Sequence, residues 1–281
     1  MIVPGSRIRR RTADVAVTAV VLAVAVIVLL PILWIAGTAF KPDEQFFTDP
    51  LTWIPHPFTL EHFRNVRGFN AGYRALLNSF VVSAVATVIS MVVGTLAAYG
   101  LARLRRRGDA WAIWFLSQRI LPPIALAIPI SLLIRELGWI DTWQGLIVPY
   151  VAINTPFVVW MMRGYFLDIP VTIEESALTE GCGRWSAFGR VILPLALPGL
   201  LSTAVFVYLY CWGEFLIAVF ITQTRESVTA TVELPSFTIA NHVLYGEMSA
   251  LSLVSALPIL VMGLFVQRYF VRGLTLGALK R

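Results

Sequence analysis

The chain has 281 residues, of which 58% are hydrophobic and only 14% are charged. Soluble domains carry charge on about a quarter of their residues, so this composition excludes a soluble protein and indicates a polytopic membrane protein. Six spans of about 20 residues each, with their loops, fill the chain and leave no room for a second large domain. The net charge of +6 comes almost entirely from arginine. Since Lys and Arg collect on the cytoplasmic side of membranes, we assign this charge to topology and predict no nucleic-acid binding.

The first predicted span is the uncharged run 15–40, which follows a basic tail, residues 1–14. The run is too long for the apolar region of a cleaved signal peptide, and no small-residue cleavage site follows it, so we expect it to remain in the membrane. The proline-rich segment 41–75 is predicted to lie outside with little regular structure, where it either contacts a binding protein or only covers the ends of the spans. The second span, 78–101, ends in a cluster of arginines at 103–107, which indicates the cytoplasmic side.

The remaining spans are expected at 111–134, 146–162, 197–222 and 251–266. The first of these contains consecutive prolines at 122 and 123, so it is predicted to be a broken helix whose freed backbone groups face protein or water rather than lipid. A turn at 138–143 and a polar segment at 223–247 are predicted to be external. An even number of spans places both termini on one side, and the distribution of Lys and Arg predicts that this side is the cytoplasm.

The segment 168–195 is the longest polar interruption between the apolar runs of the second half. Thr172 and Glu175 have the spacing of a capping box, which predicts a helix from about 173 to 180. Gly181 and Gly183 follow and are expected to end this helix. Apolar and aromatic residues next recur at helical spacing until Pro194. The segment is therefore predicted to be a helix-turn-helix beside the membrane.

This segment resembles the EAA loop of ABC importer permeases, whose pattern is Glu-Ala-Ala, three residues, Gly, nine residues, Ile-x-Leu-Pro. The spacing matches throughout, with Ser176 and Val191 as departures from the pattern. In that family the first helix of the loop docks in a cleft of the cytoplasmic ATPase and transmits nucleotide-driven motion to the spans. The resemblance implies this coupling role for Glu175, Ser176, Ala177, Leu178, Gly181, Leu193 and Pro194. Without the resemblance, the alternative is a helical hairpin beside the membrane with no coupling role, because the capping box explains Glu175 without a partner.

The resemblance extends to the runs 119–123 and 212–215 and to the tail 267–280, which together look like the shorter, MalG-like permease subunit of maltose-type carbohydrate importers. It implies an all-α, six-span permease domain over residues 1–281. It also implies a complex with a second, MalF-like permease, two cytoplasmic ATPase subunits and an extracytoplasmic solute-binding protein, in a bacterial or archaeal cell membrane. The family's tail contacts the ATPase, and residues 273–281 either do the same or bind lipid headgroups.

The sequence contains no nucleotide or metal motif of its own. Its two lysines, Lys41 and Lys280, do not belong to a phosphate loop, so ATP and Mg²⁺ are assigned to the partner subunits. The three histidines show no ligand spacing, and the two cysteines, Cys182 and Cys211, fit neither a metal site nor a disulfide. We predict no catalytic residue, no metal and no cofactor bound by this chain.

Arg119 and Glu214 are ionisable residues inside predicted spans, where charge is expensive and is expected to face the bundle interior or a water-filled cavity. They either contact substrate or pair within the protein, with each other or with another group, and Arg119 has the further option of reaching the membrane interface. Groups that suit a sugar by their aromatic faces or hydrogen-bonding atoms accompany them as candidates, although the aromatic ones also suit ordinary packing: Gln118, Asn154, Tyr208 and Trp212.

The predicted function is therefore that of a permease half in a carbohydrate ABC importer. A permease for a polyol or glycerol phosphate is the first alternative. An anionic substrate of this class would favour Arg119 in the pore. An ion-driven secondary transporter with Glu214 as its ion site is the second. A membrane enzyme is disfavoured, because the sequence offers no nucleophile–base pair and no carboxylate pair on one helix face.

Overall fold

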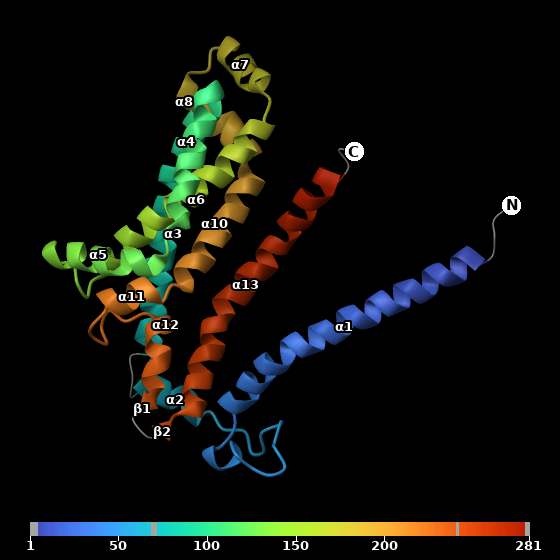
Figure 1. The fold of residues 1–281 in the computed structure, drawn as a ribbon, viewed down its shortest axis with the longest axis vertical. Helices are drawn as coiled ribbons and strands as arrows, with labels where there is room; N and C mark the ends of the chain where they lie inside the picture. Colours follow the sequence, from blue (N-terminus) through green and yellow to red (C-terminus); the bar gives the residue numbers. More distant parts are fainter. Residues whose placement is uncertain (1–4, 69–71, 240–241, 279–281) are drawn as a thin grey trace. The chain divides into compact units, whose positions relative to one another are not determined.

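The computed structural model describes residues 5–68, 72–239 and 242–278, and these ranges are almost wholly helical (Figure 1). The chain forms two compact units, a smaller one made of Met1–Phe69 with Phe237–Val254 and a larger bundle unit made of Asn70–Ser236 with Ser255–Arg281. A short ribbon in the smaller unit pairs β1 (Thr238–Ile239) antiparallel with β2 (His242–Val243). The predicted all-α class is confirmed.

Within the described residues, four helices are long and apolar enough to cross a membrane, and two bent helix pairs raise the number to six if each pair is one span. The long helices are α1 (Gly5–Ala39), α3 (Gly72–Arg103), α6 (Trp143–Asp168) and α13 (Tyr245–Ala278). Their apolar stretches coincide with predicted spans. The predicted tail 1–14 is helical from Gly5 onward, and its first four residues lie outside the described part.

The predicted break in the third span is confirmed. Helix α4 (Arg105–Ser117) runs through a short 3-10 turn, η2 (Gln118–Ile120), and the chain then bends by 89° into α5 (Pro123–Glu136). Leu121 is extended, with ψ of 126°, as expected for a residue that precedes a proline. Proline at the start of α5 costs no hydrogen bond, because the first N–H groups of a helix have no partner inside it.

The fifth span, predicted at 197–222 with no break assigned to it, is interrupted in the structure. Helix α10 (Leu197–Trp212) ends at Gly213, and a second helix, α11 (Leu216–Ile221), follows after a break. The Glu214 carboxylate accepts a 2.9 Å hydrogen bond from the backbone N–H of Ile217, so its side chain satisfies one of the free donors at the start of α11. Helix α11 packs against α5, which brings the two broken segments together.

The bundle unit is built around α3, α6 and α10, which run side by side with α4 (Figure 1). Small residues line the contact between α3 and α6. A β-carbon added at Gly94 would lie 2.6 Å from Val158, so only glycine permits this approach of the two helices. The core around this contact contains, among others, Val82, Ala86, Ala98, Met162, Phe166 and Val207.

The segment after α11 is held to the bundle by buried polar contacts. Asn78 of α3 donates 2.9 Å hydrogen bonds to the carbonyls of Glu226 and Val228. Its amide oxygen accepts from the indole N–H of Trp143, also at 2.9 Å. Because the Asn78 side chain is buried, these bonds avoid the cost of leaving its amide atoms without partners.

Asp141, in the turn between α5 and α6, ties the same segment at a second point. Its carboxylate accepts from the backbone N–H groups of Gln223 and Thr224, at 2.8 and 2.9 Å, and from the hydroxyl of Ser227. Burial raises the pKa of Asp141, but these hydrogen bonds to its charged form outweigh burial and lower the pKa to about 2. The predicted turn at 138–143 is thus present and carries an anchoring carboxylate.

Short elements occur in the segment 41–75, which was predicted to have little regular structure, and in the segment 223–247, which was predicted only to be polar and external. In the smaller unit, the turn η1 (Asp43–Gln45) precedes α2 (Glu61–Gly68), where the Thr59 hydroxyl accepts from the backbone N–H of Glu61. In the bundle unit, α12 (Ala230–Glu233) is followed by η4 (Leu234–Phe237). Their few residues carry too little periodicity to be recognised in sequence.

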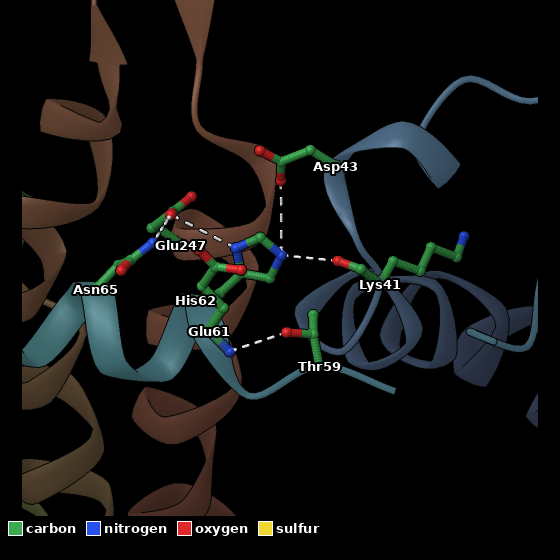
Figure 2. Close-up of polar contacts among 7 residues, drawn as sticks. All are labelled: Lys41, Asp43, Thr59, Glu61, His62, Asn65 and Glu247. Carbon is green, nitrogen blue, oxygen red and sulfur yellow. Dashed lines mark hydrogen bonds and ion pairs between the residues drawn. The ribbon is translucent and has the colours of Figure 1, made fainter. Parts of the chain in front are cut away.

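His62 organises the polar interior of the smaller unit (Figure 2). Its ring is 4% exposed, and Nε2 lies 2.7 Å from the carbonyl oxygen of Lys41, so this nitrogen donates. Nδ1 lies 3.4 Å from Oε1 of Glu247, which also accepts a 2.9 Å bond from the Asn65 amide. The Lys41 ammonium is buried 4.0 Å over the ring of Trp34, and burial lowers the pKa of Lys41. One buried ring therefore connects the end of α1, α2 and the first turn of α13.

Gly246→Ala is expected to disrupt this arrangement. A β-carbon at Gly246 would overlap the His62 ring. Overpacking of this kind costs about 1–3 kcal/mol, which thermal unfolding in detergent would record as a lower Tm. The matched control is Gly263→Ala on the same helix, where an added β-carbon meets no atom within 4 Å. An unchanged Tm for Gly246→Ala would contradict this packing.

Candidate functional site

The segment 168–195 folds as two short helical limbs at one end of the bundle unit (Figure 1). The first is α7 (Val171–Thr179). The second consists of α8 (Arg184–Ala187), the π-helical turn η3 (Phe188–Ile192) and α9 (Leu193–Leu195). The two limbs confirm the predicted helix-turn-helix.

The predicted capping box is wrong. The first helix begins at Val171, after Pro170 in the cap position, and no side chain caps it. Thr172 therefore lies inside the first turn, where its carbonyl accepts a 2.8 Å bond from the Ser176 hydroxyl. Proline has the φ that suits a helix start and lacks an N–H group, so the helix begins before the predicted cap residue.

Gly181 ends the first limb in a left-handed conformation, with φ of +91°. The N–H of Gly181 bonds to the carbonyl of Leu178, and the N–H of Cys182 bonds to that of Ala177, both at 3.1 Å. This pair of bonds is a Schellman motif, which closes a helix with a left-handed residue. An added β-carbon would meet no atom within 4 Å, so the backbone conformation, not space, requires glycine here.

Glu174 anchors the first limb to α3. Its carboxylate accepts from Nε of Arg103 at 2.6 Å and from the hydroxyl of Tyr99. The side chains of Glu174 and Arg103 are only 13% and 18% exposed, so water screens this ion pair less than a surface pair. Arg103 also donates to the carbonyl of Phe166 at 3.3 Å, which joins α6 to the same contact.

The second limb reaches the same point of α3 through aromatic packing. The ring of Tyr99 lies 4.5 Å from that of Phe188 and 5.6 Å from that of Phe166. Leu193 is half-buried against the core, whereas Pro194 is exposed. Both limbs therefore contact α3 through Tyr99.

The first limb leaves one face open. Ala177 is buried on the side of Glu174, and Leu178 is half-buried, whereas Glu175 and Ser176 are exposed. Sequence reasoning singled out Glu175 and missed Glu174. The available signal was the three-residue spacing of Glu174 and Ala177, which places both on one helix face.

A second candidate region lies at the break between α4 and α5. A cavity of about 370 Å³ is lined there by Gln118, Arg119 and Tyr210 with aromatic and aliphatic neighbours. The guanidinium carbon of Arg119 lies 4.9 Å from the ring centre of Phe157 and 4.8 Å from that of Tyr210. Within the described residues no ion pair involves Arg119 or Glu214, so pairing between them is not found. The Arg119 charge is instead placed over aromatic faces.

The other predicted pore residues do not line this cavity. Asn154 is 1% exposed and donates to the carbonyl of Tyr150 at 2.9 Å and to the sulfur of Cys211 at 3.4 Å. Tyr208 and Trp212 are buried and stack at 5.7 Å. These three residues belong to the packed interior of this chain. No cluster of His, Cys, Asp and Glu suitable for a metal occurs in the part of the chain that the structure describes.

Residues 90–275, which include both limbs, the Arg103 contact and the cavity, match a family model described as "Binding-protein-dependent transport system inner membrane component". The chain belongs to this family. It is thus a multi-pass inner-membrane transport component.

Transport permeases resemble the chain over nearly its whole length. It is 35% identical to the trehalose transport system permease protein SugB of Mycobacterium tuberculosis, over 90% of this chain and 92% of that protein. It is 32% identical to the trehalose/maltose transport system permease protein MalG of Thermococcus litoralis, over 91% and 93% respectively. A subunit in the crystal structure of a bacterial ABC transporter for import of the acidic polysaccharide alginate has the same fold, with a TM-score of 0.79 at 21% identity, covering 96% of this chain and 99% of that one.

Proposed function

We propose that this chain is one permease subunit of an ATP-driven carbohydrate importer, where it forms half of the translocation pore and couples ATPase closure to alternating access. The observation that carries the proposal concerns the segment 168–195, which we call the coupling loop. The two faces of its first limb have different surroundings. Its inner face is fixed to α3 by Glu174, and its outer face presents Glu175 and Ser176 to a partner. The names of relatives that transport trehalose and maltose support the carbohydrate class.

Coupling would proceed through rigid contacts. A displacement of the first limb by the ATPase is passed to α3 through Glu174 and Arg103, while Phe188 passes motion of the second limb to Tyr99. Helix α3 then moves α6, because the close approach at Gly94 leaves no space for the two helices to slide independently.

The complex that this role requires contains a second, MalF-like permease, two ATPase subunits that bind ATP and Mg²⁺, and an extracytoplasmic solute-binding protein. This chain performs no covalent chemistry. Both termini face the cytoplasm in this arrangement, with the coupling loop on the same side. The tail 273–281 would contact the ATPase, although its last residues, 279–281, lie outside the described part of the chain.

Sugar would contact the Arg119 cavity during passage. Aromatic side chains in the lining suit the C–H face of a sugar ring, and the free N–H groups of Arg119 suit its hydroxyls.

Asn154, Tyr208, Trp212 and Glu214 remain candidates for the open pore. Arg119 has no carboxylate partner among the described residues, so its charge suits an anionic substrate. This supports the second candidate, a permease for a polyol or glycerol phosphate, through the phosphate group. For Glu214, its hydrogen bond at the start of α11 supports a structural role over that of an ion site in a secondary transporter.

Co-purification tests the function directly. Tagged chain extracted from its native membranes in mild detergent should bring down a second permease and a phosphate-loop ATPase, identified by mass spectrometry. The solute-binding protein captured with them would then be screened against sugars by calorimetry. Recovery of the chain alone, in a preparation that still transports without ATP, would overturn the proposal in favour of ion-driven transport.

Glu174→Gln is expected to uncouple the complex. The amide keeps the size of the side chain but loses a charge-assisted hydrogen bond worth about 1.5–3 kcal/mol, so substrate uptake per ATP hydrolysed should fall about tenfold or more in proteoliposomes. Glu180→Gln is the matched control, because Glu180 is an exposed carboxylate at the end of the same helix. Equal coupling in both variants, with Glu174→Gln assembled normally, would show that the α3 contact does not transmit motion.

Arg119 variants distinguish the two substrate classes. Arg119→Gln should lower uptake about tenfold or more while assembly is retained, because charge-assisted bonds to substrate are lost. Arg119→Lys keeps the charge but not the planar fork, so it should fail to restore uptake of a neutral sugar yet partly restore uptake of a phosphate ester. Normal uptake in both variants would remove Arg119 from the substrate path.

A further inference from the structure

A second cavity, larger than the one at Arg119, opens between α4 and α6 near the coupling loop. Its volume is about 620 Å³. The side chains in its wall come from one face of each helix: Asp109, Ala112 and Ile113 from α4, and Trp160, Met161, Arg163, Tyr165 and Asp168 from α6. Transport as proposed above makes no use of this cavity.

Polarity changes along the cavity in the same direction on both helices. On α4, Asp109 lies next to the start of the apolar segment, and Ile113 lies about one turn further in. On α6, Asp168 is the last helical residue, and Trp160 lies about two turns further in. Ile113 is 68% exposed and Trp160 is 45% exposed in the isolated chain. The cavity therefore has a charged end at the membrane surface and an apolar, aromatic end within the membrane.

The charges at the polar end suit a zwitterion. Arg163, whose side chain is 13% exposed, forms an ion pair with Asp109, whose side chain is 67% exposed. Asp168 is an additional exposed carboxylate. One guanidinium with several N–H donors can bind a phosphate, while two carboxylates outnumber it and attract a cation.

We propose that this cavity is a lipid site that takes an ethanolamine phospholipid. The phosphate binds Arg163, the ammonium binds Asp168 and Asp109, and an acyl chain lies along Ile113 and Trp160. The assignment holds whichever way the chain faces, since it requires only that this end of α4 and α6 meets a membrane surface. The site would couple lipid composition to the first limb of the loop, because Asp168 is separated from α7 by two residues.

Gly164 offers a means of filling the cavity without disturbing the helices. It lies in the cavity wall, and an added β-carbon would meet no atom within 4 Å. Gly164→Leu would therefore occupy the space of the lipid. Gly100→Leu is the matched control, because Gly100 also lies near the end of a span in α3 and has no atom within 4 Å of an added β-carbon.

The test is native mass spectrometry of the full chain, in its complex, released from nanodiscs that contain equal amounts of phosphatidylethanolamine and phosphatidylglycerol. We expect retained phosphatidylethanolamine on the unmodified chain and on Gly100→Leu, and about tenfold less on Gly164→Leu. Asp168→Asn, which leaves the space open, should lose the preference for phosphatidylethanolamine over phosphatidylglycerol. A site that retains phosphatidylglycerol instead, equal retention in Gly164→Leu, or dissociation of the partner permease from Gly164→Leu would each overturn the proposal, the last by making the cavity a subunit interface.

Discussion

The ion pair between Glu174 and Arg103 fixes the first limb of the segment 168–195 to the bundle unit. It joins residues 71 positions apart in sequence, at the C-terminal end of α3. Helix α3 is 32 residues long and so extends about 48 Å. At its opposite end Asn78 holds the segment after α11 through two backbone carbonyls. One helix thus has a polar anchor at each end and a tight apolar contact, Gly94 against Val158, between them.

These anchors are polar for a physical reason. In lipid there is no hydrophobic drive to bring helices together, so close packing of small residues and satisfied hydrogen bonds must provide the association. The α3–α6 contact uses the first means and Asn78 uses the second. The two limbs of the segment 168–195 use both, because Glu174 is bonded to α3 while Phe188 packs on Tyr99. A loop attached in this way can follow α3 as a rigid part.

Sequence reasoning found what depends on local composition. Long apolar runs located the helices, the proline pair located the break before α5, and glycine at 181 located the end of the first limb. It failed where partners distant in sequence decide the structure. Glu175 was favoured over Glu174 because a local capping pattern was visible, whereas the contact with Arg103 was not. The break in the fifth span was missed for a different reason: no proline marks it, and the Glu214 bond at the start of the next helix, although it spans only three residues, was not recognised as a helix start.

Arg119 and Glu214 both lie at helix breaks, which explains why charged residues occur inside spans at all. A break leaves backbone donors and acceptors without helical partners, and these must be satisfied within the protein. Glu214 satisfies an N–H of α11 directly. Arg119 follows the last turn of α4 and places its charge over Phe157 and Tyr210. Had these two half-buried residues paired with each other, moving one break would have separated two opposite charges at a cost in free energy. Because each is stabilised separately, the segments at α5 and α11 can change position without breaking an ion pair between them, as the proposed pore, opening to alternate sides, would require.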